Sequence, residues 1–179
     1  NVSSIINLSK RKFFNSIILN YDEKSDSLLK WYQQLIGESL GKKSKGILPI
    51  VSSMPMDNHT LMQYYLDGRK NSFFTFFSVA EKESKKINKN KLPKSYYKLQ
   101  GYTSNEILFA QKNATEKVFR KKNIPFRSFN IFKRDESTMG ELFCFFMLET
   151  ILLARAMKVN PFDQPSVELI KKETKKILF

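Results

Sequence analysis

Short apolar runs typical of β-strands alternate along this chain with longer segments whose apolar residues recur at helical spacing. The apolar runs lie at 16–20, 47–51, 73–79 and within 124–132. Alternating strands and helices are typical of an α/β domain, because each helix returns the chain to the edge of the sheet where the next strand begins. The order therefore predicts a parallel sheet that is covered on both faces and binds its ligands at the carboxyl ends of the strands.

Periodicity and capping residues predict the helices of this domain. We expect helices over about 25–40, 104–122 and 137–158, and a last one that begins after Asp163 or Gln164. The apolar run 142–157 is interrupted by Glu149 and falls short of the ~20 residues that a membrane span needs, so a buried helix is expected there. The last helix is expected to have a buried side, marked by Val167, Ile170, Ile177 and Leu178.

The composition suits one globular domain in a reducing compartment. The chain has 179 residues, of which 41% are apolar and 16 are phenylalanines that can fill a core. Its single cysteine, Cys144, cannot form an internal disulfide, which agrees with a cytoplasmic location. Because the chain begins at Asn1 without a start signal, we expect it to be a fragment of a longer protein.

A net charge of +14 and a pI near 9.8 raise the possibility of a nucleic-acid partner. However, only 6 of the 31 basic residues are arginine, the side chain best suited to phosphate and guanine. Lysine, asparagine, isoleucine and phenylalanine are abundant together, as an A/T-rich coding sequence would make them. The basic stretch 85–98 is therefore expected to be a solvated surface loop, and a basic nucleic-acid-binding module remains the less favoured alternative.

The sequence lacks the patterns that are typical of several common kinds of active site. The six scattered glycines form neither a dinucleotide-binding turn nor a phosphate loop, and one cysteine with one histidine cannot make a typical metal cluster. No serine lies in a nucleophile-elbow context. The sequence therefore favours acid/base chemistry without a metal or cofactor.

Five polar residues are candidates for such chemistry. Glu38 lies in the last turn of the helix expected over 25–40, which is an unusual place for a negative charge because unpaired backbone carbonyls gather there. Gln34 lies one turn before it on the same face. His59 follows a strand in a polar loop, and its imidazole suits proton transfer. Gln164 and Lys171 are seven residues apart and share a face of the last helix. Taken singly, each is better explained as an ordinary solvated side chain.

Three segments together resemble one known family. They are Trp31 to Lys42 (WYQQLIGESLGK), Asp57 to Thr60 (DNHT) and Asn160 to Lys172 (NPFDQPSVELIKK). Their order and spacing are similar to three successive signatures of glucose-6-phosphate isomerase. The resemblance implies that residues 1–179 are the C-terminal sugar-isomerase (SIS) domain of a longer two-domain enzyme. It further implies a three-layer α/β/α sandwich with a mainly parallel sheet of about five strands.

The resemblance also implies a reaction and a role for each candidate residue. The family is an aldose-ketose isomerase that interconverts glucose 6-phosphate and fructose 6-phosphate through a cis-enediol, in glycolysis and gluconeogenesis and without a cofactor. Glu38 matches its general base, and His59 matches a histidine that assists ring opening from the second subunit of a homodimer. Lys171 resembles the lysine near the ring oxygen of the sugar. Gln34 and Gln164 match two glutamines that line the substrate pocket.

The sequence also departs from the family at several points. Leu40, Asn58 and Ile170 replace residues that are common there. The family's phosphate-binding loops and its Gly-Gly-Arg segment belong to the N-terminal domain, which is missing from this chain, so the isolated chain is expected to be inactive. A non-catalytic domain that binds a phosphosugar remains an alternative.

Overall fold

The structure is a computed structural model that describes residues 1–80, 85–88, 90 and 93–179. Its centre is a sheet with the order β2-β1-β3-β4, in which all three pairings are parallel. The strands are β1 (Asn15–Asn20), β2 (Leu48–Ser53), β3 (Ser72–Val79) and β4 (Phe126–Ile131). The predicted α/β class is confirmed, but the described residues form four strands and not about five. The four strands correspond to the four apolar runs of the sequence, and the fifth was implied only by the family resemblance.

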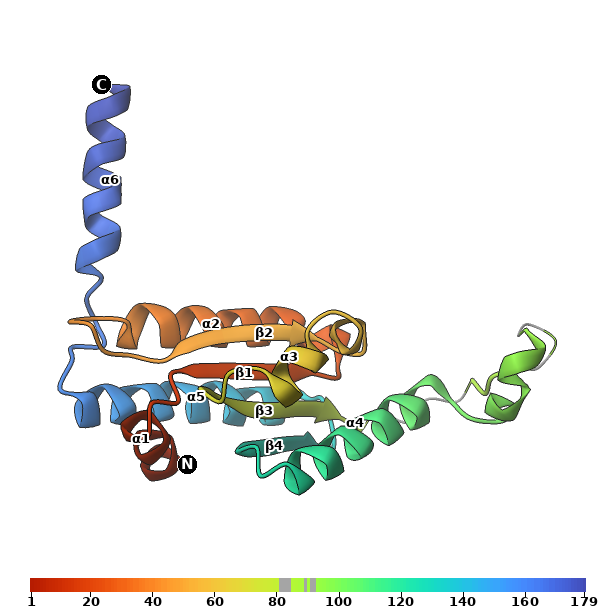
Figure 1. The fold of residues 1–179 in the computed structure, drawn as a ribbon. Helices are drawn as coiled ribbons and strands as arrows, with labels where there is room; N and C mark the ends of the chain where they lie inside the picture. Colours follow the sequence, from red (N-terminus) through yellow and green to blue (C-terminus); the bar gives the residue numbers. More distant parts are fainter. Residues whose placement is uncertain (81–84, 89, 91–92) are drawn as a thin grey trace.

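Helices cover both faces of the sheet, so the molecule has three layers (Figure 1). One layer contains α1 (Val2–Lys10), α2 (Asp26–Leu40) and α5 (Glu136–Met157), and the other contains α3 (Met62–Asp67) and α4 (Ser104–Lys121). Strand β3 is buried along its whole length. Phe73 and Phe77 point into the α2 and α5 layer, whereas Phe74 and Phe76 point into the α3 and α4 layer. This alternation explains why the run FFTFFSV has no polar face.

The local signals predicted most helix ends. Thr103 and Glu106 form a reciprocal capping box at the start of α4, as the pattern Thr-x-x-Glu favours. The start of α5 was predicted at Ser137 or Thr138, but Asp135 is the cap and accepts a hydrogen bond from the amide of Thr138 (2.9 Å). Helix α1 was not predicted. Short 3-10 helices at Glu23–Ser25, Met56–Asn58 and Lys94–Leu99 lie in connections.

A buried polar network joins α2, α5 and the sheet. Tyr32 donates a hydrogen bond to Glu149 Oε2 (2.7 Å), and the guanidinium of Arg127 binds both carboxylate oxygens of Glu149. Arg127 Nε also donates to Thr75 Oγ1 (3.0 Å). Burial raises the pKa of Tyr32 well above its ordinary value. The network explains how Glu149 can interrupt an apolar helix, because its charge is paired and fully hydrogen-bonded.

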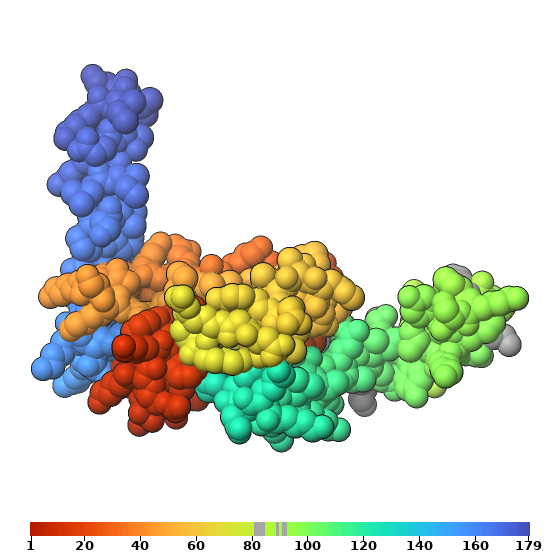
Figure 2. Space-filling view, viewed as in Figure 1, coloured from red at the N-terminus to blue at the C-terminus, as the bar shows by residue number. Residues whose placement is uncertain are grey.

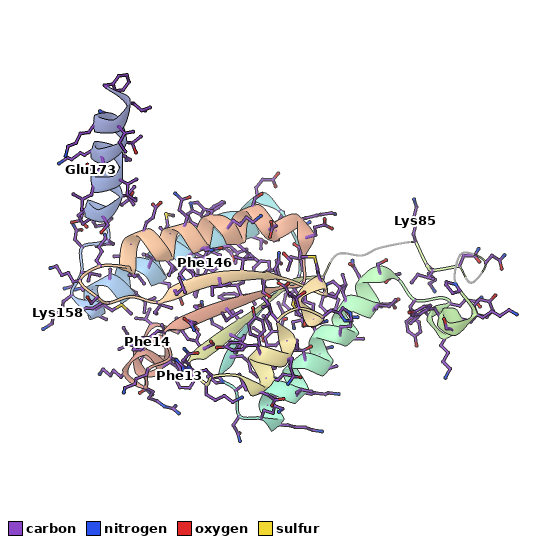
Figure 3. All side chains as sticks on the ribbon, turned by 45° about the horizontal axis from the view of Figure 1, so that its top comes forward. Phe13, Phe14, Lys85, Phe146, Lys158 and Glu173 are labelled. Carbon is purple, nitrogen blue, oxygen red and sulfur yellow. The ribbon has the colours of Figure 1, made fainter. Side chains whose placement is uncertain are left out.

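Helix α5 is buried on one side only. The prediction of a buried helix is therefore confirmed for the side that faces the core and wrong for the opposite side. Phe146 stacks on Tyr32 inside the core, between α2 and the sheet (Figure 3). The opposite side exposes Cys144 and a row of large apolar side chains, Phe143, Met147, Leu148, Ile151 and Leu152. By length and composition α5 could cross a membrane, but a third of its apolar window is buried inside this domain. The exposed row is an apolar surface that nothing in the described chain covers.

Two segments project from the domain (Figure 2). Helix α6 (Pro165–Leu178) extends from one end, begins with a proline as predicted, and contains no buried residue, so its expected buried side is exposed in this chain. At the other end the 3-10 helix Lys94–Leu99 lies in an exposed excursion, as the charge pattern predicted. Part of the basic run, Lys89, Lys91 and Leu92, lies outside the described residues.

Candidate functional site

The carboxylate of Glu38 is held by two glutamines near the end of α2. Gln34 Nε2 donates to Glu38 Oε1 (3.1 Å) from one turn earlier on the same helix. Gln164 Nε2 donates to Glu38 Oε2 (2.6 Å) from the residue that precedes α6. These amide donors stabilise the charged carboxylate, which opposes the unfavourable field of the helix end. The structure thus brings together three of the five predicted site residues and fixes the orientation of the carboxylate.

A second contact joins the same two segments. Lys42 Nζ lies 2.8 Å from Asp163 Oδ1 and also donates to the backbone carbonyl of Asn160. The Lys42 ammonium holds the pKa of Asp163 below its ordinary value. Gly41 allows the turn that places Lys42 here, since a Cβ at Gly41 would lie 2.8 Å from the Gly37 carbonyl oxygen. The end of α2 is therefore fastened to the linker between α5 and α6.

A small cavity lies between these segments. Its volume is about 140 Å³, and its lining includes Glu38, Lys42, Gln164 and Val167. Ligand pockets for drug-sized molecules typically measure roughly 300–1,000 Å³, so this cavity is one wall of a site and not a complete pocket.

A larger cavity lies on the other side of Gly37 and Gly41. It measures about 750 Å³, is mainly apolar, and carries Lys10, Lys45 and Lys158 among its lining residues. Lys158 lies at the end of α5 (Figure 3). None of the predicted site residues lines this second cavity.

The carboxyl end of β2, which precedes His59, and the C-terminal end of α2, which carries Glu38, lie at opposite ends of the strands (Figure 1). Helix α2 runs antiparallel to the strands, so Glu38 lies near the end of the sheet where the strands begin. His59 instead follows the carboxyl end of β2. A strand of six residues such as β2 spans roughly 20 Å, so the two side chains do not meet within one chain. His59 is exposed, and the preceding loop is held by Asp57, which accepts hydrogen bonds from Ser52 Oγ (2.7 Å) and the amide of Ser53 (2.9 Å). Among the candidates, only His59 lies where an open α/β sheet was expected to bind ligands.

Lys171 lies two turns into α6, roughly 10 Å along the helix axis from Gln164. It is exposed and pairs with Glu168 one turn earlier (2.6 Å). The structure therefore does not bring Lys171 to Glu38. Its distance from the rest of the site depends on what α6 packs against.

Sequence reasoning missed the pairing of Lys42 with Asp163. Both residues lie in the motifs, but no role was predicted for Lys42, and Asp163 was considered only as a residue after which the last helix begins. The two are 121 positions apart, and nothing in either local pattern indicates a partner. Among the described residues, no three His, Cys, Asp or Glu side chains form a group that could hold a metal ion.

The parallel four-stranded sheet between two helical layers is the architecture of a SIS-type α/β domain. Searches of solved structures agree. A hypothetical protein from Thermus thermophilus matches 98% of this chain and 44% of its own with a TM-score of 0.88 at 25% identity. A glucose-6-phosphate isomerase from Chlamydia trachomatis matches 99% of this chain and 37% of its own with a TM-score of 0.76. At 18% identity this second match supports the fold alone.

Curated relatives give a narrower comparison than the solved structures. A probable glucose-6-phosphate isomerase from Methanococcus maripaludis is 33% identical over 88% of this chain, and the glucose-6-phosphate isomerase of Mycoplasmopsis pulmonis is 35% identical over 96%. The chain is thus homologous to glucose-6-phosphate isomerases over most of its length, which confirms the resemblance seen in the motifs. It spans only 35% and 41% of the length of these two relatives. No protein-family model matches the sequence.

Proposed function

We propose that this chain forms one wall of the active site of an enzyme that interconverts glucose 6-phosphate and fructose 6-phosphate. The observation that carries the proposal is the carboxylate of Glu38, which is held by Gln34 and Gln164 at the positions where the motifs match the isomerase family. The names of the curated relatives support the same reaction. A carboxylate oriented by hydrogen bonds from neutral amides is a suitable general base, because it is aligned without being neutralised by a cation.

In the proposed reaction Glu38 removes the proton from C2 of the open-chain aldose and returns it to C1. The C2 electron pair forms the cis-enediol, and a proton reaches the former carbonyl oxygen at C1. Reprotonation at C1 and loss of the C2 hydroxyl proton then yield the ketose. Lys171 and His59 assist the preceding opening of the sugar ring, and Gln34 and Gln164 line the pocket. Ring opening breaks the bond between C1 and the ring oxygen, with the C1 hydroxyl losing a proton and the ring oxygen gaining one. The isomerisation steps that follow are proton transfers, for which a positioned base contributes typically ~10²- to 10⁴-fold.

The proposed active site requires further lining residues that this chain does not supply. The cavity beside Glu38 is small, and the apolar rows on α5 and α6 are exposed, which supports their burial against another part of the protein. We infer that an N-terminal sugar-isomerase domain covers them and that the isolated chain is inactive. The distance between His59 and Glu38 supports a homodimer in which His59 acts in the site of the second subunit. Location in the cytoplasm stays a prediction.

The test is Glu38→Gln in the natural full-length protein. The amide keeps the size and most hydrogen bonds of the side chain but cannot accept the C2 proton. Turnover in a coupled isomerase assay should therefore fall at least ~10²-fold with little change in thermal unfolding. Glu23→Gln, at an exposed position in the 3-10 helix before α2, is the matched control. Near-normal turnover of Glu38→Gln would show that Glu38 is not the base.

A full-length wild-type protein that binds fructose 6-phosphate without turnover would favour the alternative of a non-catalytic phosphosugar sensor. Affinity for nucleic acid that falls steeply with salt would instead favour the basic module.

A further inference from the structure

The burial of the Lys42 side chain is not explained by helix capping or by an ordinary surface position. Its side chain is only 9% exposed, whereas the carboxylate of its partner Asp163 is half exposed. Burying a lysine is costly unless its ammonium group is paired and hydrogen-bonded. The ammonium of Lys42 meets this requirement through two acceptors, the Asn160 carbonyl and the Asp163 carboxylate.

These two acceptors are the ends of one tight turn. Within the turn, the amide of Phe162 donates to Asn160 Oδ1 (3.1 Å), so the segment Asn160 to Asp163 has a defined shape. Lys42 binds the first and last residues of the segment and thus holds the turn as a unit. The next residue in the chain is Gln164, whose amide reaches Glu38.

The spacing of the contact residues at the end of α2 matches that of their partners before α6. Glu38 and Lys42 are four residues apart at the end of α2, and they contact the adjacent residues Gln164 and Asp163. Glu38, Lys42 and Gln164 line the same small cavity. We propose that Lys42 is a positioning residue, whose ammonium group fastens the turn before α6 to the end of α2 and thereby keeps the Gln164 amide against the Glu38 carboxylate. This proposal rests on the proposed function for its catalytic consequence, but the fastening itself can be measured without activity.

The first test is hydrogen exchange in this chain, wild type against Lys42→Met. Loss of a hydrogen-bonded charge should increase exchange about tenfold or more at the amides of Phe162 and Glu168, which are hydrogen-bonded within this segment. Lys43→Met is the matched control, since it removes the same charge from the exposed neighbouring residue and should leave exchange in this segment unchanged. Asp163→Asn, at an exposed position, should reproduce the increase without altering a buried side chain. Unchanged exchange in both Lys42→Met and Asp163→Asn would overturn the proposal.

The second test asks whether Lys42 acts through Gln164. In the full-length protein, Lys42→Met should lower kcat/KM about tenfold in the wild-type background but less than about twofold in a Gln164→Ala background. An equal loss in both backgrounds would mean that Lys42 acts directly on the substrate or only on folding, and would overturn the proposal. Failure of the proposed function would appear separately, as an active Glu38→Gln variant beside an intact effect on hydrogen exchange.

Discussion

Replacing Arg127 by methionine should destabilise this domain strongly, because it leaves a buried carboxylate without its cation. The side chain of Glu149 is 2% exposed and that of Arg127 is 16% exposed. After the substitution Tyr32 would be the one side-chain donor left from the network. Breaking a buried ion pair on one side typically costs about 3–5 kcal/mol. Since Arg127 retains some contact with solvent, we expect a loss of about 3 kcal/mol in the free energy of unfolding.

The assay is urea unfolding of this chain followed by the fluorescence of its single tryptophan. Trp31 lies on α2 and packs edge-on against Phe143 of α5, with ring centroids 4.7 Å apart. Its signal therefore reports the separation of the two helices that the network joins. The matched control is Arg120→Met, whose side chain is 72% exposed and has a guanidinium nitrogen 4.0 Å from Glu116. A long ion pair with a solvated cation contributes about 0–1 kcal/mol.

The double variant Arg127→Met with Glu149→Met distinguishes the contribution of the ion pair from the contribution of side-chain packing. Replacing both charges by apolar side chains of similar length removes the unpaired carboxylate, so the double variant should be more stable than Arg127→Met alone. A loss below about 1 kcal/mol in Arg127→Met would refute this reasoning. So would a double variant whose loss equals the sum of the two single losses.

Two further predictions concern pH and ring opening. Burial raises the pKa of Tyr32, so its contribution to stability is complete below the ordinary tyrosine pKa near 10 and is lost as the pH rises above it, with a slope of up to ~1.4 kcal/mol per pH unit. The free energy of unfolding of Tyr32→Phe should therefore fall less steeply than that of wild type between pH 10 and 12, and identical slopes would contradict the prediction. In the full-length protein, Lys171→Ala should slow the reaction of the cyclic sugar more than that of an open-chain analogue, and equal slowing would exclude a role in ring opening.

Local sequence patterns predicted the α/β class well, because strands, helices and their caps depend mainly on residues that are neighbours in the sequence. The runs at 16–20 and 73–79 became β1 and β3, and Thr103 became the cap of α4. Such features follow from backbone hydrogen bonding and side-chain periodicity within one segment. The partial exposure of α5 and α6 was not predicted, since an apolar side identifies a surface that prefers burial and does not identify what covers it.

The sequence alone determined the order of strands and helices, the position of Glu38 near the end of a helix, and the motifs that connect it with Gln164 and His59. Only the tertiary structure decided which of these residues meet. It placed Gln164 against Glu38 across 126 positions and left His59 at the opposite edge of the sheet. Lys42 acquired its role in the same way, by a contact with Asp163. The physical reason is that contacts between distant segments depend on the packing of whole helices on the sheet, which no local pattern in either segment encodes.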